Sequence, residues 1–204
     1  MPDADAELDD ELSLLVEVAR EAGKLSLAGL QKRAKSWHKP PGNPVTAADI
    51  AINDLISKRL RQARPGYGWL SEETKDNPLD RTQDRVWVVD PIDGTKDFVK
   101  GEAGFCVSIA RLEGRQPVAG VVYNPLLDEL FAARVGGGAT MNGKPVRVTT
   151  HSELSCHMVG QSDVFVRGGA AKYWPGIEIL TPVPNSIAWR IVVMQRDQYF
   201  EGFY

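Results

Sequence analysis

Apolar residues recur at helical spacing in two stretches near the start of the chain. The first set predicts an amphipathic helix over residues 11–32 and consists of Leu12, Leu15, Val16, Ala19, Ala22, Gly23 and Leu30. The second set predicts a helix that ends before Pro65-Gly66 and consists of Ala48, Ile52, Leu55, Ile56 and Leu60. Residues 39–44 carry prolines and a glycine and separate the two helices. Residues 1–10 are acidic, and we expect them to fray.

Shorter apolar runs follow and predict strands. They cover residues 67–71, 86–89, 104–112, 118–123, 129–134 and 139–141. Residues 75–85 are polar and predict a loop, and Asn142-Gly143 predicts a hairpin turn. The triplet 136–138 is all glycine but lacks the lysine and the spacing of a P-loop, so it also indicates a hairpin turn. Helices followed by consecutive hairpin strands predict an α+β fold, a layered sandwich with helices on an antiparallel sheet.

The last fifty residues have a different pattern. Strands are predicted at 156–160, 177–180 and 198–203, with helices at 164–172 and 186–194 between them. This alternation predicts a smaller α/β half. We therefore expect an N-terminal α+β domain over residues 1–154 and a partial C-terminal α/β domain over residues 155–204.

The most informative stretch follows the apolar run 86–89. Pro91 has no N–H group and is not expected to continue a central strand, and Asp93-Gly94 is a turn signal. Asp90 and Asp93 therefore lie at the carboxyl end of a strand, where open sheets bind ligands. Two like charges about 4 Å apart repel by about 4 kcal/mol at an effective dielectric of 20, so this pair indicates a hard cation such as Mg²⁺. The alternative is that both acids belong to an ordinary turn.

A longer motif extends this pair. Residues 90–95, Asp-Pro-Ile-Asp-Gly-Thr, match the D-P-x-D-G-T signature of the inositol monophosphatase family of metal-dependent, lithium-sensitive phosphatases. Ser71-Glu72-Glu73 resembles the upstream E-E motif of this family, and residues 43–49 resemble its (D/S)-x-V-T-x-x-D segment. The resemblance runs from about Leu12 to about Phe203. The three motifs fall within residues 1–154, so we expect the N-terminal α+β domain to be the metal-binding domain.

The resemblance implies a set of metal ligands. Glu72 would hold the first Mg²⁺ and orient the attacking water, Asp90 would bridge two metals, and Asp93 would hold the second. Ile92 would contribute its backbone carbonyl, whereas Glu73 is expected to be structural. Two or three Mg²⁺ ions would screen the incoming phosphate, lower the pKa of a bound water and stabilise the leaving alkoxide.

The resemblance also assigns roles to three further residues. The Thr95 hydroxyl would bond to Asp49 and help to activate the water. Gly94 and Thr95 would bind the substrate phosphate, because exposed N–H groups at a helix start bind anions. Two alternatives stay open, since Thr95 is also a plain helix cap and Thr46-x-x-Asp49 also fits a capping box.

Substrate preference rests on smaller differences. Ser71-Glu72-Glu73 and residues 94–98 resemble the S-E-E and G-T-K-E-F segments of 3'(2'),5'-bisphosphate nucleotidases more than the G-E-E and G-T-T-N-F of inositol monophosphatases. The S-R-S-H and S-S-L-K segments of the nucleotidases appear as residues 160–163 and 186–189 without the arginine and the lysine, for which Arg167 or Arg190 would have to substitute. We predict a Mg²⁺-dependent bisphosphate nucleotidase, with inositol monophosphatase as the alternative.

Composition limits the partners. The net charge of −3 over 204 residues gives no basic footprint for a nucleic acid polymer. No apolar run is long enough for a membrane span and the N-terminus has no signal-peptide pattern, so we expect no membrane and a cytoplasmic location. The histidines have no metal-ligand spacing, and Cys106 and Cys156 indicate core thiols. The expected partner is a small phosphorylated metabolite, with a possible homodimer.

The chain departs from the family pattern at its C-terminal end. The family carries a W-D-x-A-A motif after the strand that resembles residues 199–204, and its aspartate completes the metal sites. This sequence stops before that motif. Either these residues are part of a longer protein, or one ligand is lacking. The second possibility makes a catalytically idle phosphate- or metal-binding module an alternative of another class.

Overall fold

The computed structural model describes residues 2–31, 36–39, 43–75, 77–147, 157–158, 178–179 and 186–194. The helices in these ranges are α1 (Pro2–Gln31), α2 (Ala47–Ala63), the 3₁₀-helix η1 (Asp80–Thr82), α3 (Thr95–Lys100) and α6 (Ile187–Met194). The strands are β1 (Ser36–Lys39), β2 (Asn43–Thr46), β3 (Gly68–Ser71), β4 (Arg85–Asp93), β5 (Cys106–Glu113), β6 (Gln116–Asn124), β7 (Glu129–Arg134), β8 (Gly138–Met141), β9 (Lys144–Val146), β10 (His157–Met158) and β11 (Glu178–Ile179).

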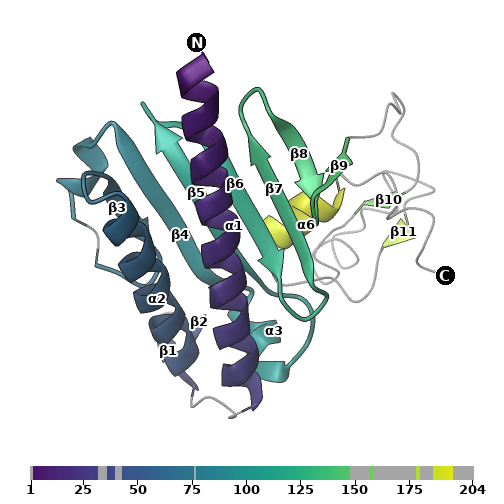
Figure 1. The fold of residues 1–204 in the computed structure, drawn as a ribbon. Helices are drawn as coiled ribbons and strands as arrows, with labels where there is room; N and C mark the ends of the chain where they lie inside the picture. The colour runs from purple at the N-terminus through teal and green to yellow at the C-terminus, as the bar shows by residue number, and fades with distance from the viewer. Residues whose placement is uncertain are drawn as a thin grey trace, which may run out of the picture.

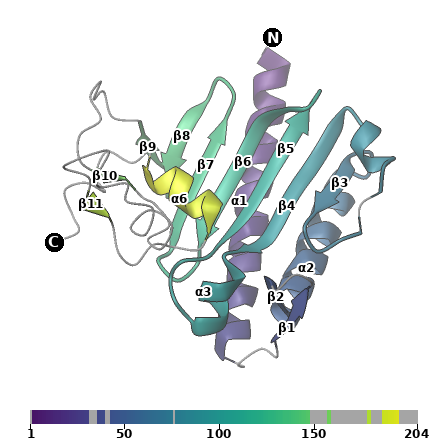
Figure 2. The same cartoon turned by 180° about the vertical axis from the view of Figure 1, so that it is seen from behind.

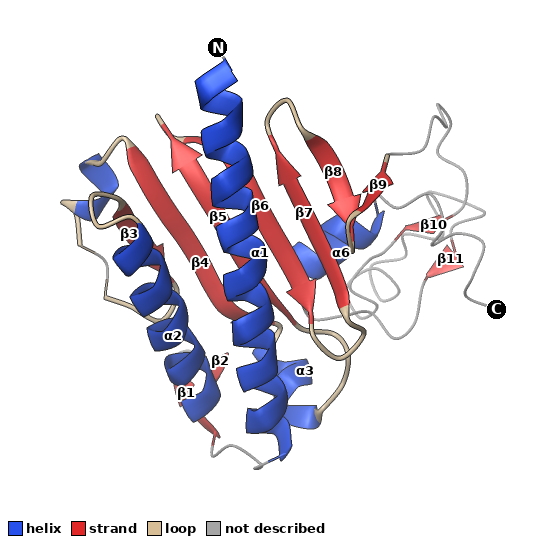
Figure 3. Cartoon of the chain, viewed as in Figure 1, coloured by secondary structure: helices blue, strands red, loops and turns tan. Residues whose placement is uncertain are grey.

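Seven strands form one sheet in the order of the chain, from β3 to β9 (Figure 3). β3 pairs with β4 in parallel, and every later pair in this sheet is antiparallel. The predicted α+β fold with helices on a sheet is confirmed. The sheet is mixed rather than purely antiparallel, because the long connection through η1 returns the chain parallel to β3.

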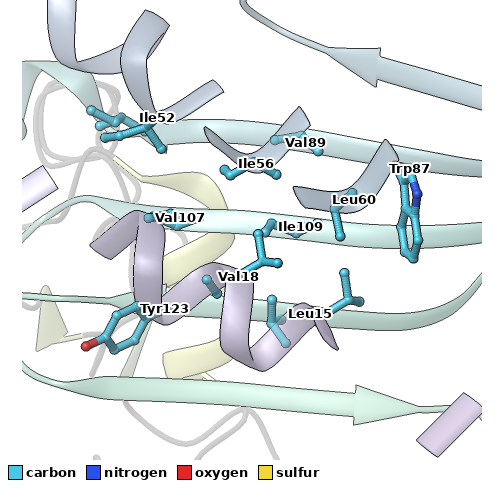
Figure 4. Packing of buried hydrophobic residues seen from close by; sticks show 14 of the residues in the cluster. Leu15, Val18, Ile52, Ile56, Leu60, Trp87, Val89, Val107, Ile109 and Tyr123 are labelled. Carbon is cyan, nitrogen blue, oxygen red and sulfur yellow. The ribbon is translucent and has the colours of Figure 1, made fainter. Parts of the chain in front are cut away.

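Helices α1 and α2 lie side by side on one face of the sheet (Figure 1). Their apolar stripes meet the strands in a common core, in which Leu15, Ile56, Trp87 and Ile109 are buried (Figure 4). Burying each aliphatic side chain of this size contributes about 1.5–3 kcal/mol. α6 lies on the opposite face (Figure 2), where Trp189 packs edge-on against Phe131 with ring centroids 5.7 Å apart.

The N-terminal segment is helical, so the expectation that residues 1–10 fray is wrong for residues 2–10. Charged residues of the sheet hold this part of α1. Arg134 donates to Asp9 at 2.9 Å, and Arg85 bonds to Glu7. Arg85 and Arg134 are far from this segment in sequence, so these contacts could not be predicted from the acidic residues alone.

Strand β4 continues through Pro91, which corrects the prediction that the strand stops there. Asp90 pairs with Ser108, but Asp93, three positions on, pairs with Cys106, so β4 carries an extra residue at this point. Such a bulge releases a residue from the hydrogen-bond ladder. Pro91, which has no N–H group to donate, is tolerated there.

Most other local predictions are confirmed. α2 ends at Ala63, before Pro65, and Asn142 and Gly143 both adopt positive φ in the turn between β8 and β9, at 49° and 78°. Gly136 and Gly137 lie in the connection between β7 and β8, and Gly138 begins β8. The predicted loop 75–85 contains η1, and the hairpin β1–β2 was not predicted.

The C-terminal half is described only in part. β10 and β11 form a short parallel pair within two of its predicted strands, and α6 confirms the last predicted helix. The predicted helix 164–172 and strand 198–203 lie outside the described residues. So does the proposed boundary at residue 154, and the two-domain division stays a prediction. No helix in the described ranges has the length and apolar character to cross a membrane.

Candidate functional site

The pairing of β3 with β4 brings Glu72 beside Asp90. Ser71 is the last residue of β3 and pairs with Val89. The N–H group of the following residue, Glu72, donates to the Val89 carbonyl oxygen at 3.2 Å. Glu72 and Asp90 therefore leave neighbouring parallel strands at the same end of the sheet. Asp93 follows on β4 after the bulge. The three carboxylates predicted as metal ligands thus lie at one end of this strand pair.

We call Glu72, Asp90 and Asp93 the acidic cluster. Within it, Asp90 has a strongly raised pKa. Burial raises the pKa of Asp90 to about 8, and the negative charges of Glu72 and Asp93 and a hydrogen bond with Glu72 add to the effect. The charge of Asp49 contributes in the same direction. Surrounded only by these groups, Asp90 is mostly protonated at neutral pH. A cation in the cluster would remove the proton, because it favours the ionised form.

The donors of the acidic cluster fit Mg²⁺ in kind. Carboxylate and carbonyl oxygens are the ligands of hard divalent cations. Burial and the negative charges of Glu72 and Asp93 raise the pKa of Asp90, and a bound cation would oppose both effects. Within the described ranges, no three His, Cys, Asp or Glu side chains already converge on a point that could hold a metal ion. The acidic cluster is therefore an electrostatically coupled group whose side chains would have to turn toward a bound cation.

Helix α6 holds Asp93 from the far side of the sheet. The Ser186 hydroxyl and the Ala188 N–H group both donate to Asp93 Oδ2, each at 2.7 Å. Ser186 Oγ in turn accepts the Trp189 N–H group at 2.8 Å, so Ser186 caps the helix. Both of these hydrogen bonds are accepted by Asp93 Oδ2, and neither involves Oδ1. This role of Ser186 was not predicted from the sequence, although a serine before an apolar helical run is an N-cap signal.

Cys106 also contacts Ser186. Its Sγ is 3.2 Å from Ser186 Oγ, it is fully buried, and burial raises the pKa of its thiol. The prediction of a core thiol is confirmed for Cys106, and Cys156 lies outside the described residues.

Thr95 and Asp49 lie within reach of each other, although 46 positions separate them. Thr95 Oγ1 is 3.5 Å from Asp49 Oδ1 and 3.1 Å from the Ile92 carbonyl oxygen, so its hydroxyl is shared between the two acceptors. Asp49 is buried in the first turn of α2, the position that a capping box also requires. The contact predicted from the family resemblance is therefore present, and the capping alternative stays open because the Thr46 side chain lies outside the described part of the chain.

Gly94 forms the turn between β4 and α3. Its φ is +92°, and a Cβ atom there would lie 2.6 Å from the Gly104 carbonyl oxygen and 3.0 Å from the Ser186 nitrogen. Only glycine fits this close approach of three backbone segments. The Gly94 carbonyl accepts the N–H groups of Asp97 and Phe98, so Gly94 and Thr95, the predicted phosphate-binding residues, form the start of α3.

Comparison with known proteins identifies relatives of this arrangement. The model of the inositol monophosphatase family matches residues 7–172. The chain is 39% identical over 155 residues to inositol monophosphatase 1 of Solanum lycopersicum, covering 75% of this chain and 57% of that protein. It is 41% identical over 152 residues to an inositol-1-monophosphatase of Mesorhizobium japonicum, covering 73% and 56%.

A solved structure agrees in fold. The extragenic suppressor protein suhB of Bartonella henselae superposes with a TM-score of 0.80 at 26% identity, over 91% of this chain and 74% of that one. The chain thus spans a little over half the length of the two curated relatives, 57% and 56%.

Proposed function

This chain belongs to the inositol monophosphatase family, and we propose that it hydrolyses a small phosphomonoester with Mg²⁺ held by the acidic cluster. One observation carries this proposal. Asp90 is half-buried at the end of the sheet where Glu72 and Asp93 also lie, and its burial together with their charges raises its pKa to about 8, so a cation beside it would stabilise its ionised form.

We assign a separate role to each group of the proposed site. Glu72, Asp90, Asp93 and the Ile92 carbonyl would hold two or three Mg²⁺ ions, which supply charge neutralisation for the phosphate and acidify the attacking water. Ser186 and the start of α6 fix Asp93 in place. The buried Asp49 carboxylate accepts from Thr95 and offers a route for the proton that the water loses. The N–H groups of Gly94, which precedes α3, and of Thr95, its first residue, would contact phosphate oxygens.

For the substrate, we propose an inositol monophosphate rather than a nucleoside bisphosphate. The curated relatives described above are named inositol monophosphatases, which supports the alternative from the sequence analysis better than its main prediction. The structure also gives another role to one of the two nucleotidase-like features. The Ser71 hydroxyl is buried and donates to Asn53 on α2, which gives this side chain a structural role. Lys96, the other feature, is exposed.

We expect kcat/KM for inositol 1-phosphate to exceed that for adenosine 3',5'-bisphosphate by at least about tenfold, a difference of about 1.4 kcal/mol in transition-state binding. Steady-state kinetics with both substrates at saturating Mg²⁺ measures this. Lys96→Ala serves as the matched variant, because it should change turnover of the inositol phosphate by less than about twofold. A higher efficiency on the bisphosphate, lost in Lys96→Ala, would instead establish the nucleotidase prediction.

Turnover also separates this proposal from its alternative of another class. An idle phosphate- or metal-binding module would bind Mg²⁺ and release no phosphate from either substrate. Homodimer formation and a cytoplasmic location stay predictions from the sequence.

A further inference from the structure

The turn that carries Glu72 is held on both sides by one amide side chain from α2. The Ser71 hydroxyl donates to Asn53 Oδ1 at 2.6 Å, and Asn53 Nδ2 donates to Thr74 Oγ1 at 3.1 Å. Ser71 and Thr74 are the first and last residues of the turn that contains Glu72 and Glu73. A single side chain therefore closes both ends of this turn.

Further bonds reinforce the closure. Ser71 Oγ accepts the Glu73 N–H group at 3.3 Å, and the Thr74 N–H group donates to the Ser71 carbonyl at 3.4 Å. The indole N–H group of Trp69 donates to Thr74 Oγ1 at 3.3 Å. The backbone of Glu72 itself is fixed to Val89 on β4. The turn thus has little freedom as long as Asn53 keeps its two bonds.

The bond between Ser71 and Asn53 is buried, so the loss of either partner is expected to be costly. Asn53 is 6% exposed and Ser71 is 8% exposed, so water cannot easily replace either partner of the bond between them, whereas Thr74 is exposed. Asn53 also lies one helical turn after Asp49, on the same side of α2. One helix therefore presents both the carboxylate that contacts Thr95 and the amide that fixes the Glu72 turn.

We propose that Asn53 is a positioning residue for the metal site: with Ser71 and Thr74 it orients the Glu72 turn toward Asp90 and couples it to the Asp49 helix. This inference rests on the proposed function, because it takes Glu72 to be a metal ligand. It gives a role to two residues, Asn53 and Ser71, that neither the motif nor the acidic cluster explains. It also predicts that the effect of Asn53 on metal binding is separable from its effect on stability.

The test compares Asn53→Ala with Ile56→Val, a core substitution one turn further along α2 whose side chain is fully buried. Isothermal titration calorimetry with MgCl₂ should show a dissociation constant at least about tenfold larger in Asn53→Ala, since outer partners of metal ligands typically contribute 10–100-fold to affinity. Ile56→Val should lower the melting temperature but leave the dissociation constant within about twofold of the parent. In the metal-free protein, amide exchange at Glu73 should be faster in Asn53→Ala only.

A double variant guards against simple misfolding. Asn53→Leu with Ser71→Ala removes both buried polar partners together, which should restore much of the melting temperature, yet Mg²⁺ binding should stay at least about tenfold weaker than in the parent. Parent-like Mg²⁺ affinity and Glu73 exchange in the variants would overturn the positioning role while the proposed function stands. Failure of the unmodified protein to bind Mg²⁺ would overturn both.

Discussion

Replacing Asp90 with asparagine should lower phosphomonoesterase kcat/KM by roughly 10³-fold or more, because it removes the carboxylate expected to bridge two metal ions. The same change should make the metal-free protein more stable at pH 8. Asparagine has a similar shape but cannot ionise, and the carboxylate that it replaces is half-buried beside the negative charges of Glu72 and Asp93. Activity and metal-free stability are thus expected to change in opposite directions.

The pH dependence follows from the direction of the shift. The folded-state pKa of Asp90, about 8, is raised above its ordinary value of 3.8. The stabilisation from its protonated form is therefore complete below about pH 4 and is lost as the pH rises to 8. In the presence of a chelator, Asp90→Asn should melt at least about 5 °C above the parent at pH 8, and within about 2 °C of it at pH 4.5. Circular dichroism melts measure this, and a variant less stable than the parent at pH 8 would contradict the raised pKa of Asp90.

Asp49→Asn and Thr95→Ala should each lower kcat by about 10²–10⁴-fold, and the double variant should lose little more than either single one. The physical reason is that one hydroxyl and one carboxylate act as a unit. Thr95 Oγ1 reaches both Asp49 and the Ile92 carbonyl, so it links the acid to the predicted metal site. Thr95→Ser is the matched control, because it keeps the hydroxyl and should retain most of the activity.

The capping interpretation of Asp49 predicts a different result. If Asp49 serves only to cap α2, Asp49→Asn should reduce the free energy of unfolding by about 1 kcal/mol or less and leave kcat nearly intact. Additive losses in the double variant would likewise argue against a functional pair. Single-turnover kinetics and denaturant titrations on the same four proteins separate the two interpretations.

The sequence pattern predicted the helices and turns that depend on a buried apolar face or on the backbone preferences of one or two residues. The 3.6-residue spacing of Ile52, Ile56 and Leu60 gave α2, and all three are buried against the sheet. The Asn142-Gly143 turn followed from residues that tolerate positive φ. The apolar run 86–89 placed Asp90 and Asp93 near the carboxyl end of a strand, although β4 continues to Asp93.

Features that depend on distant partners were not predictable in this way. The first residues of α1 are acidic, and Arg85 and Arg134, far along the chain, pair with Glu7 and Asp9 of this helix. Similarly, Asp93 is held by Ser186, 93 positions away, and Ser71 by Asn53, 18 positions away. The bulge that carries Pro91 within β4 depends on the register of β5, which no single strand encodes.

The central claim is that the acidic cluster binds a divalent cation at the expense of a proton. Calorimetric titration of the chain with MgCl₂ at pH 7, in two buffers of different ionisation enthalpy, tests it most directly. Because the pKa of Asp90 is about 8 without metal, the first Mg²⁺ should release about one proton, and Asp90→Asn should bind at least about 100-fold more weakly with no proton release. Equal affinity in the parent and the variant, or binding by the parent without proton release, would contradict the account.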